Sequence, residues 1–157
     1  MNVPFLDLKS SYHEIQNDLD SKILEVLDSG QYIGGQIVKQ FEKNFANFVD
    51  SSSCVGLANG LDALEISMRA LGIKGGDEVI SQALTFIATC NAITYAGAKP
   101  LFIDVDPDTM GLSPAALKRF LEENTEKRAS GTFNKTSGKR ISACVPMHTF
   151  GFPCRIA

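Results

Sequence analysis

Residues 78–105 read EVISQALTFIATCNAITYAGAKPLFIDV, and this stretch decides the fold class. It opens with a strand candidate over residues 78–81, centred on Val79 and Ile80, and closes with a second strand candidate over residues 101–105. Between them the pattern predicts a helix over residues 86–96 and a turn at residues 97–100. A strand, a helix and a second strand in this order predict an α/β domain with a parallel sheet.

The same alternation continues on both sides of this stretch. Upstream it predicts a strand, a helix and a loop, over residues 54–58, 61–71 and 72–77. Downstream, Ser113 and Pro114 open a helix, with serine at the cap and proline at the first helical position. Residues 122–140 are polar and predict an exposed loop or β-excursion, and residues 141–147 predict a last apolar strand. The expected fold is therefore α/β, with a mostly parallel sheet and flanking helices.

The first part of the chain has helical spacing with no strand in it. Two helices are expected there, over residues 11–27 and 36–49, and Gly30 suits the end of the first helix. We therefore divide the chain into an N-terminal helical segment, residues 1–50, and an α/β domain, residues 51–157.

Composition and charge exclude several classes of protein. The 157 residues carry a formal net charge of -3 and their basic residues are scattered, so we expect no nucleic-acid-binding surface. The apolar runs are too short to cross a bilayer and the residues after Met1 do not resemble a signal peptide, which predicts a cytoplasmic protein. The four cysteines form no C-x-x-C motif, and together with two histidines they predict no metal site.

The first candidate site is the start of the helix expected near residue 60. There Asn59, Gly60, Leu61 and Asp62 join a strand to a helix, and the free N–H groups and the helix dipole favour a bound phosphate. Asn59 and Asp62 are also good helix-start residues without any ligand. Both interpretations stay open on this segment alone.

The second candidate is Phe86, which begins the helix after the next strand. Ligands of open parallel sheets bind outside the carboxyl ends of the strands, where an aromatic ring is placed to stack on a flat cofactor. The alternative is that Phe86 is an ordinary core residue, because aromatic side chains are mostly buried.

Two further strand ends carry polar residues. Asp104 and Asp106 suit metal binding or acid–base chemistry, but the sequence around Pro107 is also good turn sequence, and we favour the turn. His148 suits an acid–base role or the support of a ligand. The alternative is a structural histidine whose ring is satisfied by backbone groups.

Taken together and in order, these segments resemble the DegT/DnrJ/EryC1/StrS family of PLP-dependent sugar aminotransferases. The resemblance runs from Val3 to Gly151, and residues 70–80, ALGIKGGDEVI, are its most characteristic part. The other matching segments are residues 3–8, 29–35, 38–42, 58–64, 85–89, 97–100, 104–107 and 146–151.

The resemblance implies the fold and the cofactor. The chain would be the N-terminal part of the large domain of a fold-type-I PLP-dependent transferase, which is aspartate aminotransferase-like. Backbone amides of Leu61 and Asp62 would hold the phosphate of pyridoxal 5'-phosphate, Gly60 would belong to the same cofactor-binding turn, and Phe86 would stack on the pyridine ring. Position 61 is often threonine or serine in the family, and Leu61 lacks the hydroxyl that these residues add.

The resemblance also implies the reaction. A homodimer, with its active sites at the subunit interface, would transfer an amino group from glutamate to a keto group of a nucleotide-linked deoxysugar. Tyr32, Ile33 and Gly34 match a segment near the sugar substrate at this interface. The Schiff-base lysine and the acidic partner of the pyridine nitrogen would follow Ala157, so we expect the 157 residues alone to be an inactive N-terminal fragment.

Two alternatives to this function stay open. The first is a truncated or regulatory relative that binds without catalysis, and the second is a sugar dehydratase of the same fold in which a histidine replaces the lysine. The long polar excursion over residues 122–140 is similar to a branch of the family that aminates sugars on routes to bacillosamine-like or legionaminic-type products.

Overall fold

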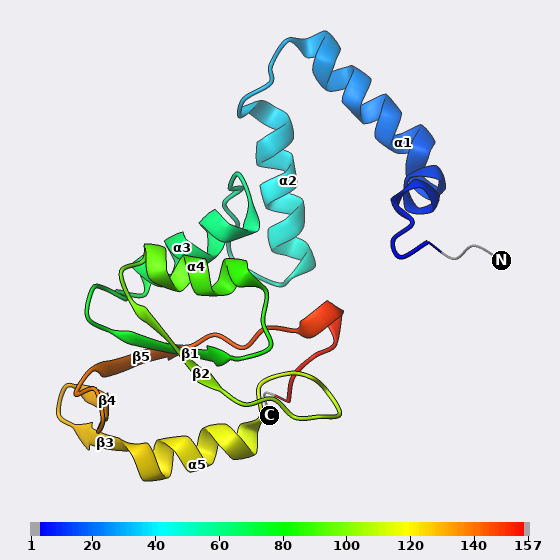
Figure 1. Ribbon diagram of the computed structural model, residues 1–157. Helices are drawn as coiled ribbons and strands as arrows, with labels where there is room; N and C mark the ends of the chain where they lie inside the picture. The colour runs from blue at the N-terminus through cyan, green and yellow to red at the C-terminus, as the bar shows by residue number, and fades with distance from the viewer. Residues whose placement is uncertain (1–3, 156–157) are drawn as a thin grey trace. The chain divides into compact units, whose positions relative to one another are not determined.

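The computed structural model describes residues 4–155 (Figure 1). Val3, in the first segment of the resemblance, and Ala157 lie outside the described residues. The chain divides into two compact units between Gly56 and Leu57, whereas the sequence pattern placed the boundary after residue 50. Each unit is described by itself.

The first unit holds the two expected helices, α1 (Leu8–Ser29) and α2 (Gly35–Phe48). Asp7 caps α1, because its Oδ1 accepts the backbone N–H of Ser10 at 3.0 Å. Gly30 ends the helix in the left-handed region, with φ 67°, which glycine adopts at little cost. None of the α1 residues is buried, although its apolar residues follow helical spacing.

The second unit is built on a five-stranded sheet with the order β2-β1-β5-β4-β3. Its strands are β1 (Glu78–Gln82), β2 (Lys99–Ile103), β3 (Thr125–Arg128), β4 (Gly131–Asn134) and β5 (Arg140–Cys144). The inner strand β1 pairs in parallel with β2 and with β5. The β3–β4 hairpin extends the sheet with antiparallel pairing, which confirms the β-excursion expected over residues 122–140.

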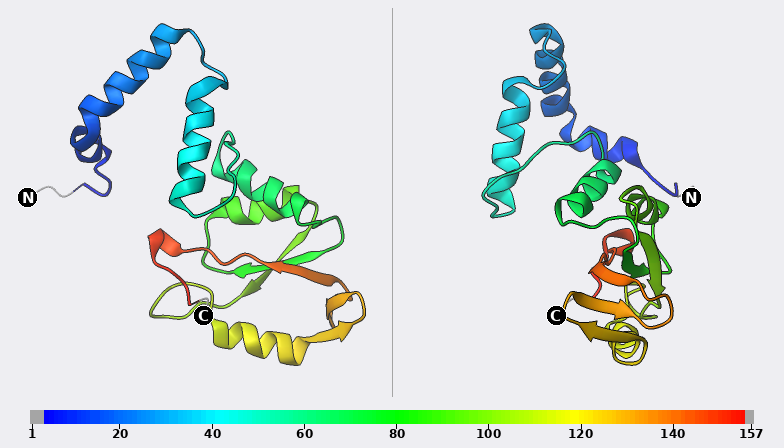
Figure 2. Two further views of the ribbon diagram at one scale, coloured as in Figure 1. Left: turned by 180° about the vertical axis from the view of Figure 1, so that it is seen from behind. Right: turned by 90° about the vertical axis from the view of Figure 1, so that its left-hand side faces the viewer.

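Helices cover both faces of this sheet. In Figures 1 and 2, α3 (Gly60–Ala70) and α4 (Ile87–Tyr95) lie on one face and α5 (Pro114–Asn124) lies on the other. Successive side chains of a strand point to opposite faces, so Val79 joins the core under α3 and α4 while Ile80 joins the core under α5. All five residues of β1 are buried, as in the central strand of a sheet covered on both sides.

The characteristic segment around residue 75 forms a close contact between two loops. A Cβ atom on Gly97 would lie 3.2 Å from the backbone nitrogen of Gly75, and Gly97 has φ 86°. Asp77 closes the first of these loops, because its Oδ2 accepts the N–H of Lys74 at 3.2 Å. Both the close approach and the positive φ therefore require glycine at position 97.

One predicted strand is wrong, and two have other bounds. The strand expected over residues 141–147 runs from Arg140 to Cys144, so Val145 and Met147 lie beyond it. Residues 54–58, expected as a strand, form no strand in the described part of the chain, because a strand needs a hydrogen-bonded neighbour and none is paired with them. The strand expected over residues 101–105 runs instead from Lys99 to Ile103. Val105 lies beyond it in an isolated bridge to Leu112.

None of the helices within residues 4–155 combines the length and the apolar character that a membrane span requires.

A buried hydrogen bond joins the hairpin to β1. Asn134 of β4 donates from Nδ2 to Oε2 of Glu78 at 2.9 Å, and both residues are buried. Oδ1 of Asn134 accepts the N–H of Thr136 in the following turn at 2.9 Å. A buried carboxyl group needs such a donor, so this contact fixes the hairpin on the sheet.

Asn134→Asp keeps the acceptor for Thr136 but sets a second carboxylate against Glu78. We expect the free energy of unfolding at neutral pH to fall by ~1–3 kcal/mol, because the buried donor is lost and like charges meet. Urea unfolding at neutral pH measures this.

The matched control is Asn44→Asp in α2, where the asparagine is exposed. An exposed substitution of this kind should change stability by less than about 0.5 kcal/mol. Equal effects of the two substitutions at neutral pH would contradict the role given to Asn134.

Candidate functional site

The carboxyl ends of β1 and β5 lie side by side, because the two strands are parallel neighbours. The segments that follow them line one hollow of about 370 Å³. Its lining residues are Leu84, Thr85, Phe86, Met147, His148, Thr149, Phe150 and Gly151. This is the position where open α/β sheets bind ligands.

Phe86 is an exposed side chain in this hollow, and its interpretation as a core residue is therefore wrong. It stands immediately before α4, in extended conformation with φ -76° and ψ 135°. Its side chain is 67% exposed, and its N–H donates to Sδ of Met147 at 3.1 Å. The backbone of Phe86 is held by this contact while most of its side chain is exposed, which is compatible with stacking on a flat ligand.

At the start of α3, one backbone amide of the first turn has a side-chain acceptor. Gly60, Leu61 and Asp62 are first-turn residues, whose N–H groups have no acceptor within the helix. Asn59 caps the helix, because its Oδ1 accepts the N–H of Asp62 at 2.9 Å. Its Nδ2 donates to Oδ2 of Asp62 at 3.0 Å. The amides of Gly60 and Leu61 are therefore the stronger candidates for an anion, with the positive end of the helix dipole behind them.

Leu61 has a packing role that accounts for an apolar residue at this position. Its side chain is half-buried and packs against the core cluster that includes Ala92 and Ile93 of α4. Its backbone amide remains at the helix start while its side chain joins the core. Burial of such an aliphatic chain contributes about 1.5–3 kcal/mol when complete.

His148 is held by its own loop. Its Nδ1 accepts the N–H of Cys154 at 3.2 Å and lies 3.4 Å from Sγ of the same residue. This contact supports the structural role of His148, since the ring nitrogen is already engaged by the backbone. Phe150, nearby, has φ 52°, which is unusual for a residue other than glycine.

The acidic residues after β2 form a turn, as favoured from the sequence. Oδ1 of Asp104 accepts the N–H of Val105 at 2.9 Å. Oδ2 of Asp106 pairs with Nη1 of Arg155 at 2.8 Å, and Asp108 pairs with Nη2 of the same guanidinium. The hydrogen bond from Arg155 lowers the pKa of the Asp108 carboxyl below its ordinary value.

Tyr32, Ile33 and Gly34 lie in the loop between α1 and α2, in the first unit. The side chains of Tyr32 and Ile33 are exposed, and the Tyr32 hydroxyl donates to the carbonyl oxygen of Leu27 at 3.2 Å. Gly34 has φ 67° and immediately precedes α2. The structure describes this loop within its own unit, so its contact with a sugar stays a prediction.

Gln82 was missed in the sequence analysis, although it contacts the segment after β5. It is the last residue of β1 and its side chain is completely buried. Its carboxamide makes hydrogen bonds to Met147 and Thr149. The signal that could have found it is a polar residue at the carboxyl end of a strand expected to be buried on both faces.

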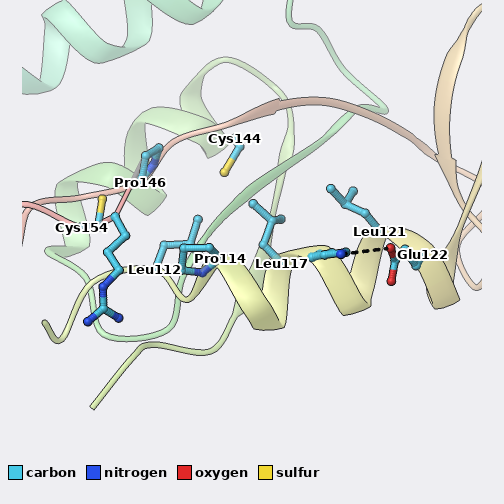
Figure 3. A pocket seen from close by; sticks show the side chains of 10 residues that line it. Leu112, Pro114, Leu117, Leu121, Glu122, Cys144, Pro146 and Cys154 are labelled. Atoms are coloured by element: carbon cyan, nitrogen blue, oxygen red, sulfur yellow. Dashed lines mark ion pairs between the residues drawn. The ribbon is translucent and has the colours of Figure 1, made fainter. Parts of the chain in front are cut away.

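A larger hollow, of about 520 Å³, lies on the face of the sheet that α5 covers. Figure 3 shows the side chains of Leu117 and Leu121 rising from α5 toward the segment that carries Cys144 and Pro146. The dashed line marks the exposed pair of Lys118 and Glu122, 3.9 Å apart. This hollow is mostly apolar, and none of the candidate cofactor residues lines it. The larger hollow is therefore not the candidate cofactor site.

The comparisons with known proteins agree on one family. The model of the DegT/DnrJ/EryC1/StrS aminotransferase family matches residues 13–157. The "Pleiotropic regulatory protein" of Geobacillus stearothermophilus is 36% identical over 96% of this chain and 36% of its own length. The UDP-2-acetamido-2-deoxy-3-oxo-D-glucuronate aminotransferase of Pseudomonas aeruginosa is 40% identical over 79% of this chain and 34% of its own.

A solved structure gives the same result for the fold. DesV of S. venezuelae, in complex with a ketimine intermediate, superposes with a TM-score of 0.81 at 34% identity. The match covers 98% of this chain and 37% of that one. The chain therefore spans about a third of the length of the proteins it matches, and the expected fold class, part of a PLP-dependent transferase domain, is confirmed.

Asn59→Ala should cost ~1 kcal/mol in the free energy of unfolding, because the N–H of Asp62 loses its side-chain acceptor. Asn59→Ser is the matched control, since serine also caps helices and should preserve most of this stability. Urea unfolding of both variants compares them. Equal stability of the alanine and serine variants would contradict the capping role.

Proposed function

The chain belongs to the DegT/DnrJ/EryC1/StrS aminotransferase family, and from this premise we propose that the complete protein is a sugar aminotransferase that uses pyridoxal 5'-phosphate. It transfers an amino group from glutamate to a keto group of a nucleotide-linked deoxysugar. The observation in the structure that carries the proposal is the exposed ring of Phe86 in the hollow at the carboxyl ends of β1 and β5. An exposed aromatic ring in this hollow contributes nothing to the hydrophobic core, whereas it suits stacking on a flat cofactor.

The residues present fit the two ends of this cofactor. The amides of Gly60 and Leu61 and the positive end of the α3 dipole suit the phosphate. Asp62 belongs to the same turn and so lies beside the proposed phosphate position, although its own N–H already donates to Asn59. Phe86 suits the pyridine ring. When bound, the cofactor supplies an electron sink for the exchange of an amino group with a keto group.

The sugar side of the proposed site involves Tyr32, Ile33 and Gly34. The exposure of Tyr32 and Ile33 supports this assignment, because their side chains have surface to offer to a ligand or a second subunit. The homodimer is part of the same proposal. It is supported by α1, whose apolar residues remain unburied and so call for a covering surface.

The residues that complete the reaction are a lysine that bonds the cofactor and moves the substrate proton, and an acid that pairs with the pyridine nitrogen. We place both in the part of the protein that these 157 residues do not include, since the chain spans about a third of its relatives. The 157 residues thus form the phosphate and ring contacts and remain inactive by themselves. A cytoplasmic location stays a prediction.

The reaction is tested with the full-length protein, pyridoxal phosphate, glutamate and a UDP-linked 3-keto sugar. We expect an amino sugar in the mass spectrum and an equal amount of 2-oxoglutarate. Cofactor binding without transfer to UDP- or dTDP-linked keto sugars would favour a regulatory protein, the function in the name of the Geobacillus relative. A dehydrated sugar would favour a dehydratase instead.

Phe86→Leu should weaken the binding of pyridoxal phosphate to the full-length protein about 2- to 10-fold. This range corresponds to the ~0.5–1.5 kcal/mol that an aromatic pair contributes beyond the area it buries. Titration followed by the absorbance of the bound cofactor measures the dissociation constant. Tyr95→Leu, which removes an exposed ring at the other end of α4, is the control and should leave that constant unchanged.

A further inference from the structure

Gln82 is a polar residue in a completely buried position, and every polar atom of its side chain is used. Its relative exposure is 0%, at the carboxyl end of β1. Oε1 accepts the N–H of Met147 at 2.9 Å, and Nε2 donates to the carbonyl oxygen of the same residue at 2.9 Å. Nε2 also lies 3.3 Å from Oγ1 of Thr149. Burying an amide is costly unless it is satisfied in this way, so these contacts define the position of the segment they hold.

The side chain of Gln82 takes over where the backbone pairing of β1 and β5 ends. The last backbone contact runs from the N–H of Val145 to the carbonyl oxygen of Ile80, at 2.8 Å. Next, the Ser81 hydroxyl donates to the carbonyl oxygen of Val145 at 2.9 Å. The carboxamide of Gln82 then binds both backbone groups of Met147, as a neighbouring strand would. Met147 is thereby held beside β1 without being part of a strand.

Met147 transmits this position to the start of α4. Its Sδ accepts the N–H of Phe86 at 3.1 Å and lies 3.5 Å from Oγ1 of Thr85. The N–H of a residue that caps the start of a helix has no acceptor within that helix, so the sulfur supplies the partner that the backbone lacks. The position of the Phe86 backbone therefore depends on Met147, and that of Met147 depends on Gln82.

We propose that Gln82 is a positioning residue of the cofactor site, which acts through Met147 on the ring of Phe86. This inference rests on the proposed function, in which Phe86 stacks on the pyridine ring. Gln82 itself is sealed from the hollow and touches no ligand there. Its effect on the site is the placement of a ring that is otherwise free to move with its loop.

The first test is hydrogen exchange of the full-length protein without cofactor, for the wild type, Gln82→Leu and Ser81→Ala. Gln82→Leu should accelerate exchange of the Met147 and Phe86 amides about 10-fold or more, since the Met147 amide loses its acceptor and the sulfur that accepts the Phe86 amide is no longer held in position. Ser81 is equally buried on the same strand, but its hydroxyl binds Val145. Ser81→Ala should therefore leave the Phe86 amide unchanged. Unchanged Phe86 exchange in Gln82→Leu overturns the proposal.

Met147→Leu gives a variant that conserves the core volume in case Gln82→Leu does not fold. It removes the sulfur acceptor and retains the backbone groups that bind Gln82. We expect faster exchange at Phe86 with slow exchange retained at position 147. Unchanged exchange at Phe86 in this variant would show that the Met147 sulfur does not hold the Phe86 amide, and it would overturn the proposal as well.

The second test is a double-mutant cycle on the dissociation constant of pyridoxal phosphate. Gln82→Leu should weaken binding about 5-fold in the wild type and have no further effect in Phe86→Leu, because it acts through that ring. Additive effects would show that Gln82 acts by another route and would overturn the inference. A wild type that binds no cofactor rejects the proposed function, whereas the exchange experiment still decides whether Gln82 positions Phe86.

Discussion

The parallel pairing of β1 with β2 on one side and with β5 on the other is the constraint on which the second unit depends. It buries all five residues of β1, and the two faces of this strand take part in separate cores under α3 and α4 and under α5. Because the two pairings are parallel, the carboxyl ends of β1 and β5 lie next to each other at the same end of the sheet. The chain leaves the sheet there through loops, and those loops form the candidate site.

Features set by local sequence could be predicted, and features that need a distant partner could not. The run at β1, the cap at Ser113 and the glycine after α1 act over a few residues, and the structure has each of them. Residues 54–58 have the composition of a strand, but a strand exists only where another chain segment accepts its hydrogen bonds. Gln82 was missed for the same reason, since its partners lie 65 and 67 positions away in the sequence.

The candidate site shows the same division. The helix start at residues 59–62 was recognised because a cap and a glycine are local signals. Whether Phe86 belonged to the core or to a site depended on which elements cover α4, and the sequence left both open. Burial excludes the core, because Phe86 is exposed while Thr89, Ala92 and Ile93 of the helix that follows it are buried. The helix thus contributes those residues to the core, and the residue that precedes it lines the hollow.

The use of the Asp62 amide by Asn59 has a consequence for the anion site. A cap that is satisfied by its own side chain stabilises α3 before any ligand arrives, so the helix start is preformed. In the proposed site, an anion would meet two amides, those of Gly60 and Leu61, in a turn that already includes the Asp62 carboxylate. Attraction by the helix dipole and repulsion by this carboxylate oppose each other, and contact with the Asn59 amide reduces the repulsion. In the proposed cofactor site, the contact between Asn59 and Asp62 would therefore tune the phosphate affinity of this turn, and stacking on Phe86 would add the selectivity that an anion site lacks.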